Sequence, residues 1–91
     1  MANESIFYKK TCVIAGIFED YYPREKLALK LKSLGARVTR NLSKKTDFFI
    51  VGEFSGLIKM HTALQLISEG NNLKIMHEHE LINEFSKLKS Y

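Results

Sequence analysis

The sequence predicts a small α/β domain, a three-layer sandwich in which helices cover both faces of a parallel sheet. Two short runs, Thr11 to Gly16 and Asp47 to Gly52, are almost continuously apolar and end at glycine. Runs of this kind are typical of strands buried on both faces. Strand and helix patterns alternate in the order β-α-β-β-α-β-α, which favours right-handed crossovers between parallel strands. The length, 91 residues, leaves room for one such domain.

The first strand is predicted over Thr11 to Gly16 and is followed by a helix that begins near Pro23. Proline suits the first helical position because its missing N–H has no partner there. The apolar residues of this helix recur at positions i, i+4 and i+7, and Gly35 ends it. They are Leu27, Leu31 and Leu34.

Two further strands, Arg37 to Thr39 and Asp47 to Gly52, precede a second helix predicted over Leu57 to Glu69. Gly70 and the asparagines after it end this helix. We expect its inward side to consist of Met60, Ala63, Leu64 and Ile67.

The last predicted strand, Leu73 to Met76, leads into a third helix over Glu78 to Leu88. Its inward residues recur at helical spacing and are predicted to be Leu81, Phe85 and Leu88.

Composition places the chain among soluble, non-repetitive proteins, with 45% hydrophobic and 26% charged residues. The single cysteine, Cys12, has no partner for an internal disulfide, and we expect a buried structural thiol in a reducing compartment. The longest apolar run, Cys12 to Phe18, is too short to span a bilayer. We therefore expect an intracellular protein of the cytoplasm, nucleoid or nucleus with no membrane partner.

Charge is distributed unevenly along the chain. Residues 1–45 carry a net charge of +6 and residues 46–91 a net charge of −2, which together make the chain's +4. A basic half favours an anionic partner such as nucleic acid or a phosphorylated protein, or it forms a solvated helix face.

The carboxyl ends of the predicted strands are where an anion would bind, because helix N-termini with free N–H groups meet there. Arg24 falls in the first turn of the first helix and Lys59 in the first turn of the second. Exposed cations at these positions oppose the helix dipole unless an anion lies between them. Gly16 allows the backbone to approach such an anion closely. These residues predict a phosphate site.

One set of residues makes the chain resemble a BRCT domain from about Phe7 to Leu88. They are Val13-Ile14-Ala15-Gly16, Leu34-Gly35-Ala36-Arg37-Val38, Leu42-Ser43-Lys44-Lys45-Thr46-Asp47-Phe48-Phe49-Ile50-Val51-Gly52, Ser55-Gly56, Lys59 and Ala63. Within that family the chain is most similar to the single BRCT domains of NAD-dependent DNA ligases and of the replication factor C large subunit. The resemblance implies a lead-in over residues 1–6, a domain over residues 7–88 and a tail over residues 89–91.

The resemblance implies a four-stranded parallel sheet of order 2-1-3-4, with the first and third helices on one face and the second on the other. It also implies a non-catalytic module without cofactor or metal, contained in a larger ligase, exonuclease or clamp loader or forming a small protein by itself. Its expected partners are 5′-phosphorylated ends of duplex DNA, or replication and repair proteins. The phosphate-binding positions carried over from the family are Ala15, Gly16, Arg24 and Lys59. From their charge, we expect Lys9, Lys10, Lys44 and Lys45 to be auxiliary basic contacts.

Ala15 departs from the family pattern because it lacks the hydroxyl of the usual Ser or Thr. This departure keeps an alternative open, a protein-interaction or dimerisation module with a degenerate phosphate pocket. Leu29 and Leu66 are candidates for its docking surface or are ordinary exposed leucines. Tyr21 and Tyr22 either stack on a terminal base or pack as a loop plug.

The histidines His77 and His79 do not predict a metal site. In a helix, a spacing of i and i+2 would point the two rings apart. The sequence also contains no nucleotide-binding glycine loop and no nucleophile signature.

Overall fold

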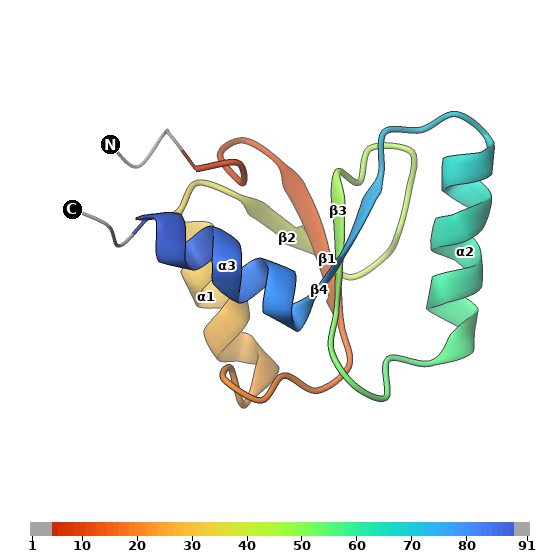
Figure 1. Cartoon of the computed structure of the whole chain (residues 1–91). Helices are drawn as coiled ribbons and strands as arrows, with labels where there is room; N and C mark the ends of the chain where they lie inside the picture. Colours follow the sequence, from red (N-terminus) through yellow and green to blue (C-terminus); the bar gives the residue numbers. More distant parts are fainter. Residues whose placement is uncertain (1–4, 89–91) are drawn as a thin grey trace.

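The computed structural model describes residues 5–88 of the chain. Its helices and strands follow the predicted order (Figure 1). They are β1 (Thr11–Ala15), α1 (Arg24–Ser33), β2 (Arg37–Thr39), β3 (Phe48–Val51), α2 (Leu57–Ser68), β4 (Lys74–His77) and α3 (Glu78–Leu88). Residues 1–4 of the predicted lead-in and all of the predicted tail lie outside the described residues.

The four strands form one parallel sheet in the order β2-β1-β3-β4, as predicted. The two strands with the most continuous apolar sequence, β1 and β3, occupy its centre, where Val13 pairs with Phe49. Helices α1 and α3 cover one face of this sheet and α2 covers the other (Figure 1). Both faces of the central strands are therefore buried, which explains why their sequences do not alternate with polar residues.

The face covered by α1 and α3 holds the larger core. The predicted inward residues Leu27, Leu31 and Leu81 are fully buried there. Phe7 belongs to the same core and meets Phe85 edge to face, with 5.7 Å between the ring centroids. Aromatic pairs favour this geometry. The segment before β1 is therefore part of the packed domain.

The opposite face, under α2, holds a smaller core, and here one prediction is wrong. Leu64 and Ile67, expected to point inward, are 54% and 38% exposed. The residues that pack on the sheet side are Met60, Ala63 and Leu66. Apolar residues occur on nearly every side of α2, so their spacing did not define its rotation about its own axis.

Cys12 is fully buried in the larger core, as expected for a structural thiol. Burial, with the nearby charge of Asp47, raises the pKa of the Cys12 thiol to about 12. The thiol is therefore protonated at neutral pH and unreactive as a nucleophile. No helix within residues 5–88 has the length and apolar character needed to cross a membrane.

Candidate functional site

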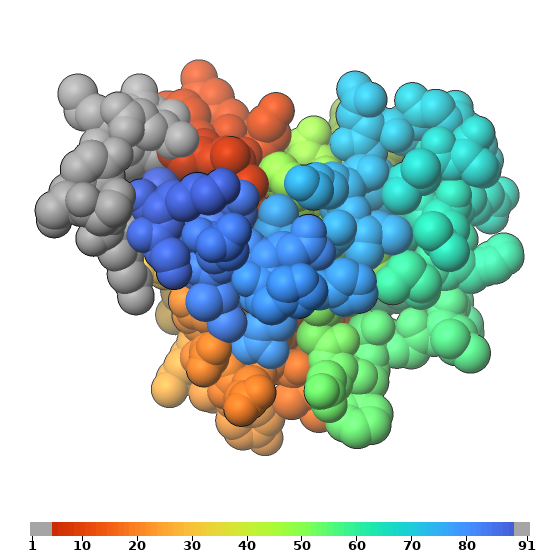
Figure 2. All heavy atoms as spheres, viewed as in Figure 1, coloured from red at the N-terminus to blue at the C-terminus, as the bar shows by residue number. Residues whose placement is uncertain are grey.

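The loops that follow β1 and β3 run side by side at the carboxyl edge of the sheet, along the lower border of the molecule in Figures 1 and 2. Between them and the start of α1 lies a cavity of about 480 Å³, which we call the basic cavity. It brings together all four predicted phosphate-binding positions. Its lining residues are Ala15, Gly16, Ile17, Phe18, Tyr22, Pro23, Arg24, Glu25, Phe54, Ser55 and Lys59.

Two glycines let the two loops cross in direct contact. Ile17 N–H donates to the carbonyl oxygen of Glu53 at 2.7 Å, and Glu53 N–H donates to the carbonyl of Ile17 at 2.9 Å. Gly16 has a φ of +90°, and a Cβ on it would lie 2.6 Å from the Glu53 oxygen. A Cβ on Gly52 would lie 2.3 Å from the Ile17 oxygen. The crossing, and with it the floor of the basic cavity, therefore depends on both glycines.

The two predicted cations enter the basic cavity from different helices. Arg24 is the first residue of α1 and Lys59 is the third residue of α2. Lys59 Nζ donates a 3.4 Å hydrogen bond to the carbonyl of Arg40. Within the described residues neither Arg24 nor Lys59 forms an ion pair with a carboxylate. Both positive charges are available to a ligand.

The N-termini of α1 and α2 border the same cavity and lack side-chain caps. The N-cap residues are Pro23 and Gly56, and neither makes a side-chain cap hydrogen bond. The first turn of α2 contains no acidic residue, whereas that of α1 contains Glu25, which also lines the cavity. Helix N-termini of this kind attract anions through their free N–H groups and their dipole.

Ala15 is 98% buried and contributes to the cavity wall without a hydroxyl. Its carbonyl accepts the N–H of Gly52 at 2.9 Å, which holds the ends of β1 and β3 together. Any polar contact to a ligand at this position must come from neighbouring groups.

The structure assigns different environments to the two tyrosines. The Tyr21 ring packs edge to face against Phe85 with centroids 5.7 Å apart, so Tyr21 is the loop plug. Tyr22 is 70% exposed and lines the basic cavity. Burial, with the charges of Asp20 and Glu78, raises the pKa of Tyr21.

Two basic residues that we did not predict extend the site. A second cavity of about 610 Å³ shares Arg24 and Lys59 with the basic cavity and is also lined by Lys32 and Arg40. Lys32 could have been found from its spacing, because residues at i and i+8 on a helix share one side. Arg40 directly follows β2, at the same carboxyl edge of the sheet.

The four auxiliary lysines lie elsewhere. Lys9 and Lys10 precede β1, and Lys44 and Lys45 precede β3, so all four are at the amino ends of the strands. None of them lines the basic cavity. Their role as contacts for a longer ligand stays a prediction.

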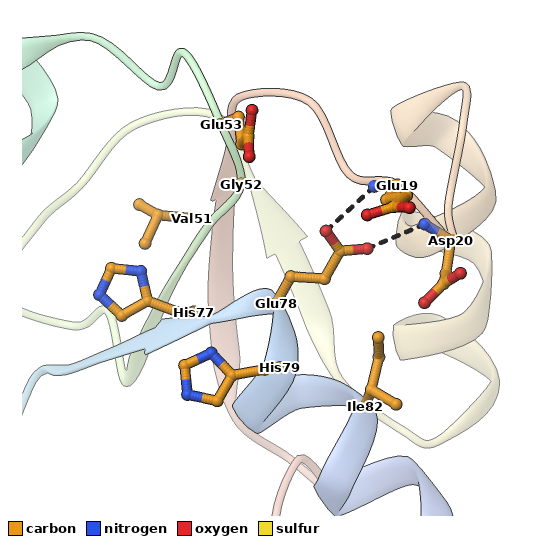
Figure 3. A pocket seen from close by; sticks show the side chains of 9 residues that line it. All are labelled: Glu19, Asp20, Val51, Gly52, Glu53, His77, Glu78, His79 and Ile82. Atoms are coloured by element: carbon orange, nitrogen blue, oxygen red, sulfur yellow. Dashed lines mark hydrogen bonds between the residues drawn. The ribbon is translucent and has the colours of Figure 1, made fainter.

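On the other side of the loop crossing lies a cavity of about 360 Å³ with several carboxylates, which we call the acidic cavity (Figure 3). Glu78, the first residue of α3, accepts hydrogen bonds from the backbone N–H groups of Glu19 and Asp20 at 3.0 and 2.9 Å. This carboxylate therefore holds the loop between β1 and α1. The lining residues are Glu19, Asp20, Val51, Gly52, Glu53, His77, Glu78, His79 and Ile82.

The rings of His77 and His79 do not point apart as predicted. They lie parallel, with an interplanar angle of 7° and centroids 6.3 Å apart. The reason is that His77 ends β4 while His79 is in the first turn of α3, so helical spacing does not apply between them. In the described part of the chain, no three His, Cys, Asp or Glu side chains are arranged to hold a metal ion.

Comparison with known proteins agrees with this architecture. Residues 2–85 match the family model of the BRCA1 C Terminus (BRCT) domain. The chain is 40% identical over 80 residues to a DNA ligase of Alkaliphilus oremlandii (strain OhILAs) and 34% identical over 86 residues to a DNA ligase of Helicobacter pylori (strain G27). These alignments cover 86% and 94% of this chain but 12% of each ligase.

A DNA ligase of Clostridium perfringens (strain 13 / Type A) is 51% identical over 53 residues, which are 58% of this chain and 8% of the ligase. The chain thus corresponds to a small part of each of these enzymes. The family match and the parallel sheet of order β2-β1-β3-β4 agree across nearly the whole sequence. The chain belongs to the BRCT family.

Proposed function

We propose that this BRCT domain binds the 5′-phosphorylated end of duplex DNA in the basic cavity. The observation that carries the proposal is the convergence of Arg24, Lys59 and two uncapped helix N-termini on one cavity. Two unpaired cations and two positive dipole ends in one place repel each other and are stabilised by a bound dianion. The relatives are DNA ligases, and an interaction module of DNA replication or repair fits that context.

Each residue of the basic cavity has a distinct part in this proposal. Lys59 and Arg24 supply charge-assisted hydrogen bonds to phosphate oxygens. Gly16 keeps the two loops in contact and contributes its backbone to the lining of the cavity. Because Ala15 has no hydroxyl, the cations and the helix N–H groups carry a larger share of the binding than in domains with Ser or Thr there.

The neighbouring charges define a direction for the DNA strand. Lys32 and Arg40 continue the positive surface toward the β2 edge of the sheet. On the β4 side, the acidic cavity presents carboxylates that repel phosphate. We therefore propose that the DNA strand continues from its terminal phosphate over α1 and β2.

The test is a fluorescence anisotropy titration that compares one duplex with 5′-phosphate or 5′-hydroxyl ends. The wild type should bind the phosphorylated duplex at least about tenfold more tightly, as expected for one or more hydrogen bonds to a charged group. Lys59→Ala should remove this preference. The matched control is Lys74→Ala, because Lys74 is an exposed lysine at the amino end of β4.

Equal binding of both duplexes by the wild type would refute the proposal. A phosphoserine peptide titrated in the same assay separates the two classes of ligand. Tighter binding of that peptide than of the phosphorylated duplex would assign the basic cavity to a protein partner instead.

We propose further that the domain tethers a DNA-joining activity to its substrate when it forms part of a longer enzyme. The support is the pattern of similarity, since the chain spans 12% of the DNA ligases it matches. If the longer protein is an exonuclease or a clamp loader instead, the domain would tether that activity to DNA in the same way.

A second candidate function, contact with another protein, is favoured by the outer side of α2. Leu57, Ile58 and Leu64 are 87%, 85% and 54% exposed. Leu57 and Leu64 line a shallow apolar hollow of about 560 Å³. Of the two leucines predicted for docking, Leu29 is exposed on α1, whereas Leu66 packs against the smaller core. The outer side of α2 therefore replaces Leu66 as the candidate surface.

Sedimentation velocity over a range of concentrations tests this surface. If it mediates dimerisation, the wild type should associate as concentration rises and Leu64→Asp should stay monomeric. Ser33→Asp is the control, because it adds the same charge at an exposed position on a different helix. A wild type that remains monomeric and pulls down no replication or repair protein would count against this function.

A further inference from the structure

Two aromatic side chains project into solvent at the rim of the basic cavity. Phe54 is 86% exposed and Tyr22 is 70% exposed, and both line the cavity together with Arg24 and Lys59. They come from different loops, one after β3 and one before α1. The rim therefore presents two aromatic rings beside two cations.

These two rings differ from the other aromatic residues of the described chain. The remaining phenylalanines are in or against the larger or smaller core, and Tyr21 packs on Phe85. Among residues 5–88, Tyr22 and Phe54 are the phenylalanine and tyrosine residues that are more than half exposed. Single exposed apolar residues are common on proteins, but here both lie at one cavity.

The backbone holds Phe54 in this exposed position. Its φ is +59°, in the left-handed region that residues other than glycine seldom adopt. The loop is pinned on one side by the hydrogen bonds between Glu53 and Ile17 and turns at Gly56, whose φ is +87°, into α2. The loop geometry thus displays the ring outward, since folding it into the core would require a different path between β3 and α2.

We propose that the rings of Tyr22 and Phe54 stack on the base of the nucleotide whose phosphate occupies the basic cavity. This inference rests on the proposed function, because it needs the phosphate between Arg24 and Lys59. At a 5′ end, the deoxyribose joins the phosphate to the terminal base, and the flat face of that base is exposed because no further base pair follows. Aromatic side chains bind such faces with little sequence preference.

The proposal identifies the partner class by its chemistry. A cation pair alone binds any phosphate monoester, including a phosphorylated side chain. A phosphoserine has no ring beside its phosphate, so exposed aromatic rings at the rim of the basic cavity favour a nucleotide end over a phosphopeptide. Ile17, which is 51% exposed at the same rim, adds apolar surface against the base or sugar.

The experiment removes the base while it keeps the phosphate. Fluorescence anisotropy titrations compare a 5′-phosphorylated duplex with the same duplex in which a stable abasic residue bears the 5′-phosphate. The wild type should bind the abasic end about tenfold more weakly, as expected for loss of stacking on one or two rings. Phe54→Ala and Tyr22→Ala should bind both duplexes with similar, reduced affinity.

Matched variants separate the effect of aromatic stacking from the effect of apolar side-chain volume. Phe54→Trp keeps an aromatic face and should retain the sensitivity to base removal, whereas Phe54→Leu keeps apolar volume and should lose it. Ile67→Ala removes an exposed apolar side chain from the C-terminal part of α2, outside the basic cavity, and should behave as the wild type.

The outcomes distinguish this inference from the proposed function. If the wild type fails to prefer 5′-phosphate over 5′-hydroxyl ends, the proposed function fails. If that preference holds but base removal leaves wild-type affinity unchanged, the stacking inference alone is overturned. It is also overturned if Phe54→Leu retains the wild-type sensitivity to base removal.

Discussion

The basic and acidic cavities lie on opposite sides of the same loop crossing, yet they use their charges differently. In the acidic cavity, the Glu78 carboxylate is occupied by the backbone N–H groups of Glu19 and Asp20. In the basic cavity, Arg24 and Lys59 form no ion pair with any described residue. The contrast shows that charge alone does not identify a binding site. A charge without a partner inside the protein is more informative.

The loop crossing between the two cavities is where a substitution should have its largest effect on stability. Gly16→Ala should lower the free energy of unfolding by about 3 kcal/mol, because it combines a positive φ with a collision of Cβ and the Glu53 oxygen. The control is Gly70→Ala, whose φ is +94° but whose Cβ would meet nothing within 4 Å. Gly70→Ala should lower the free energy of unfolding by about 1 kcal/mol.

Urea unfolding of both variants measures this difference, which isolates the collision from the backbone strain that the two positions share. If Gly16→Ala and Gly70→Ala cost the same, the crossing is not the rigid element that we describe.

Charges in the basic cavity and charges in the acidic cavity should differ in their effect on the salt dependence of DNA binding. In anisotropy titrations over a series of salt concentrations, Lys59→Ala should reduce the slope of log affinity against log salt by about one, because one phosphate contact releases its counterion. Its affinity at low salt should fall by about tenfold. Glu19→Gln, which removes a charge that lines the acidic cavity and not the basic cavity, should leave the slope unchanged. An equal change of slope in both variants would contradict the assignment.

On the acidic side, substitution of Glu78 tests whether its carboxylate stabilises the fold without taking part in phosphate binding. Glu78→Ala removes the acceptor of two backbone hydrogen bonds and should lower the free energy of unfolding by about 1 kcal/mol. The preference for 5′-phosphate ends should remain, since Glu78 does not line the basic cavity.

Thermal and urea unfolding measure the stability effect of Glu78→Ala, and Glu69→Ala serves as the control because Glu69 is an exposed glutamate after α2. A Glu78→Ala protein as stable as Glu69→Ala would show that the carboxylate does not hold the loop. Loss of the phosphate preference would instead assign it a part in binding.

Much of the fold was predictable because the relevant signals are local. The runs that became β1 and β3 are apolar throughout, which indicates strands covered on both faces. The predicted bounds of β2 and α3 agree with the structure. Gly16 and Gly52 were expected in the strands but lie just beyond them, since both are needed for the loop crossing.

The candidate site was predictable in part. Arg24, Lys59 and Gly16 follow from the rule that helix N-termini gather at the carboxyl edge of a parallel sheet, and the family resemblance added Ala15. Phe54 was not singled out, because its exposure at the cavity depends on the loop crossing and on its own φ of +59°. Arg40 was missed because its position at the second cavity, beside Arg24 and Lys59, depends on the pairing of β2 with β1.

The amino-acid sequence by itself determined the alternation of strands and helices, the parallel sheet and the edge at which a phosphate site would form. These depend on periodicity and on glycine positions, which act within a few residues of each other. The tertiary structure decided which side of α2 faces the sheet, which tyrosine lines the basic cavity and which carboxylates are already bound. Those features depend on contacts between residues far apart in the chain, such as Glu78 with Glu19, and only the packing of whole elements brings such residues together.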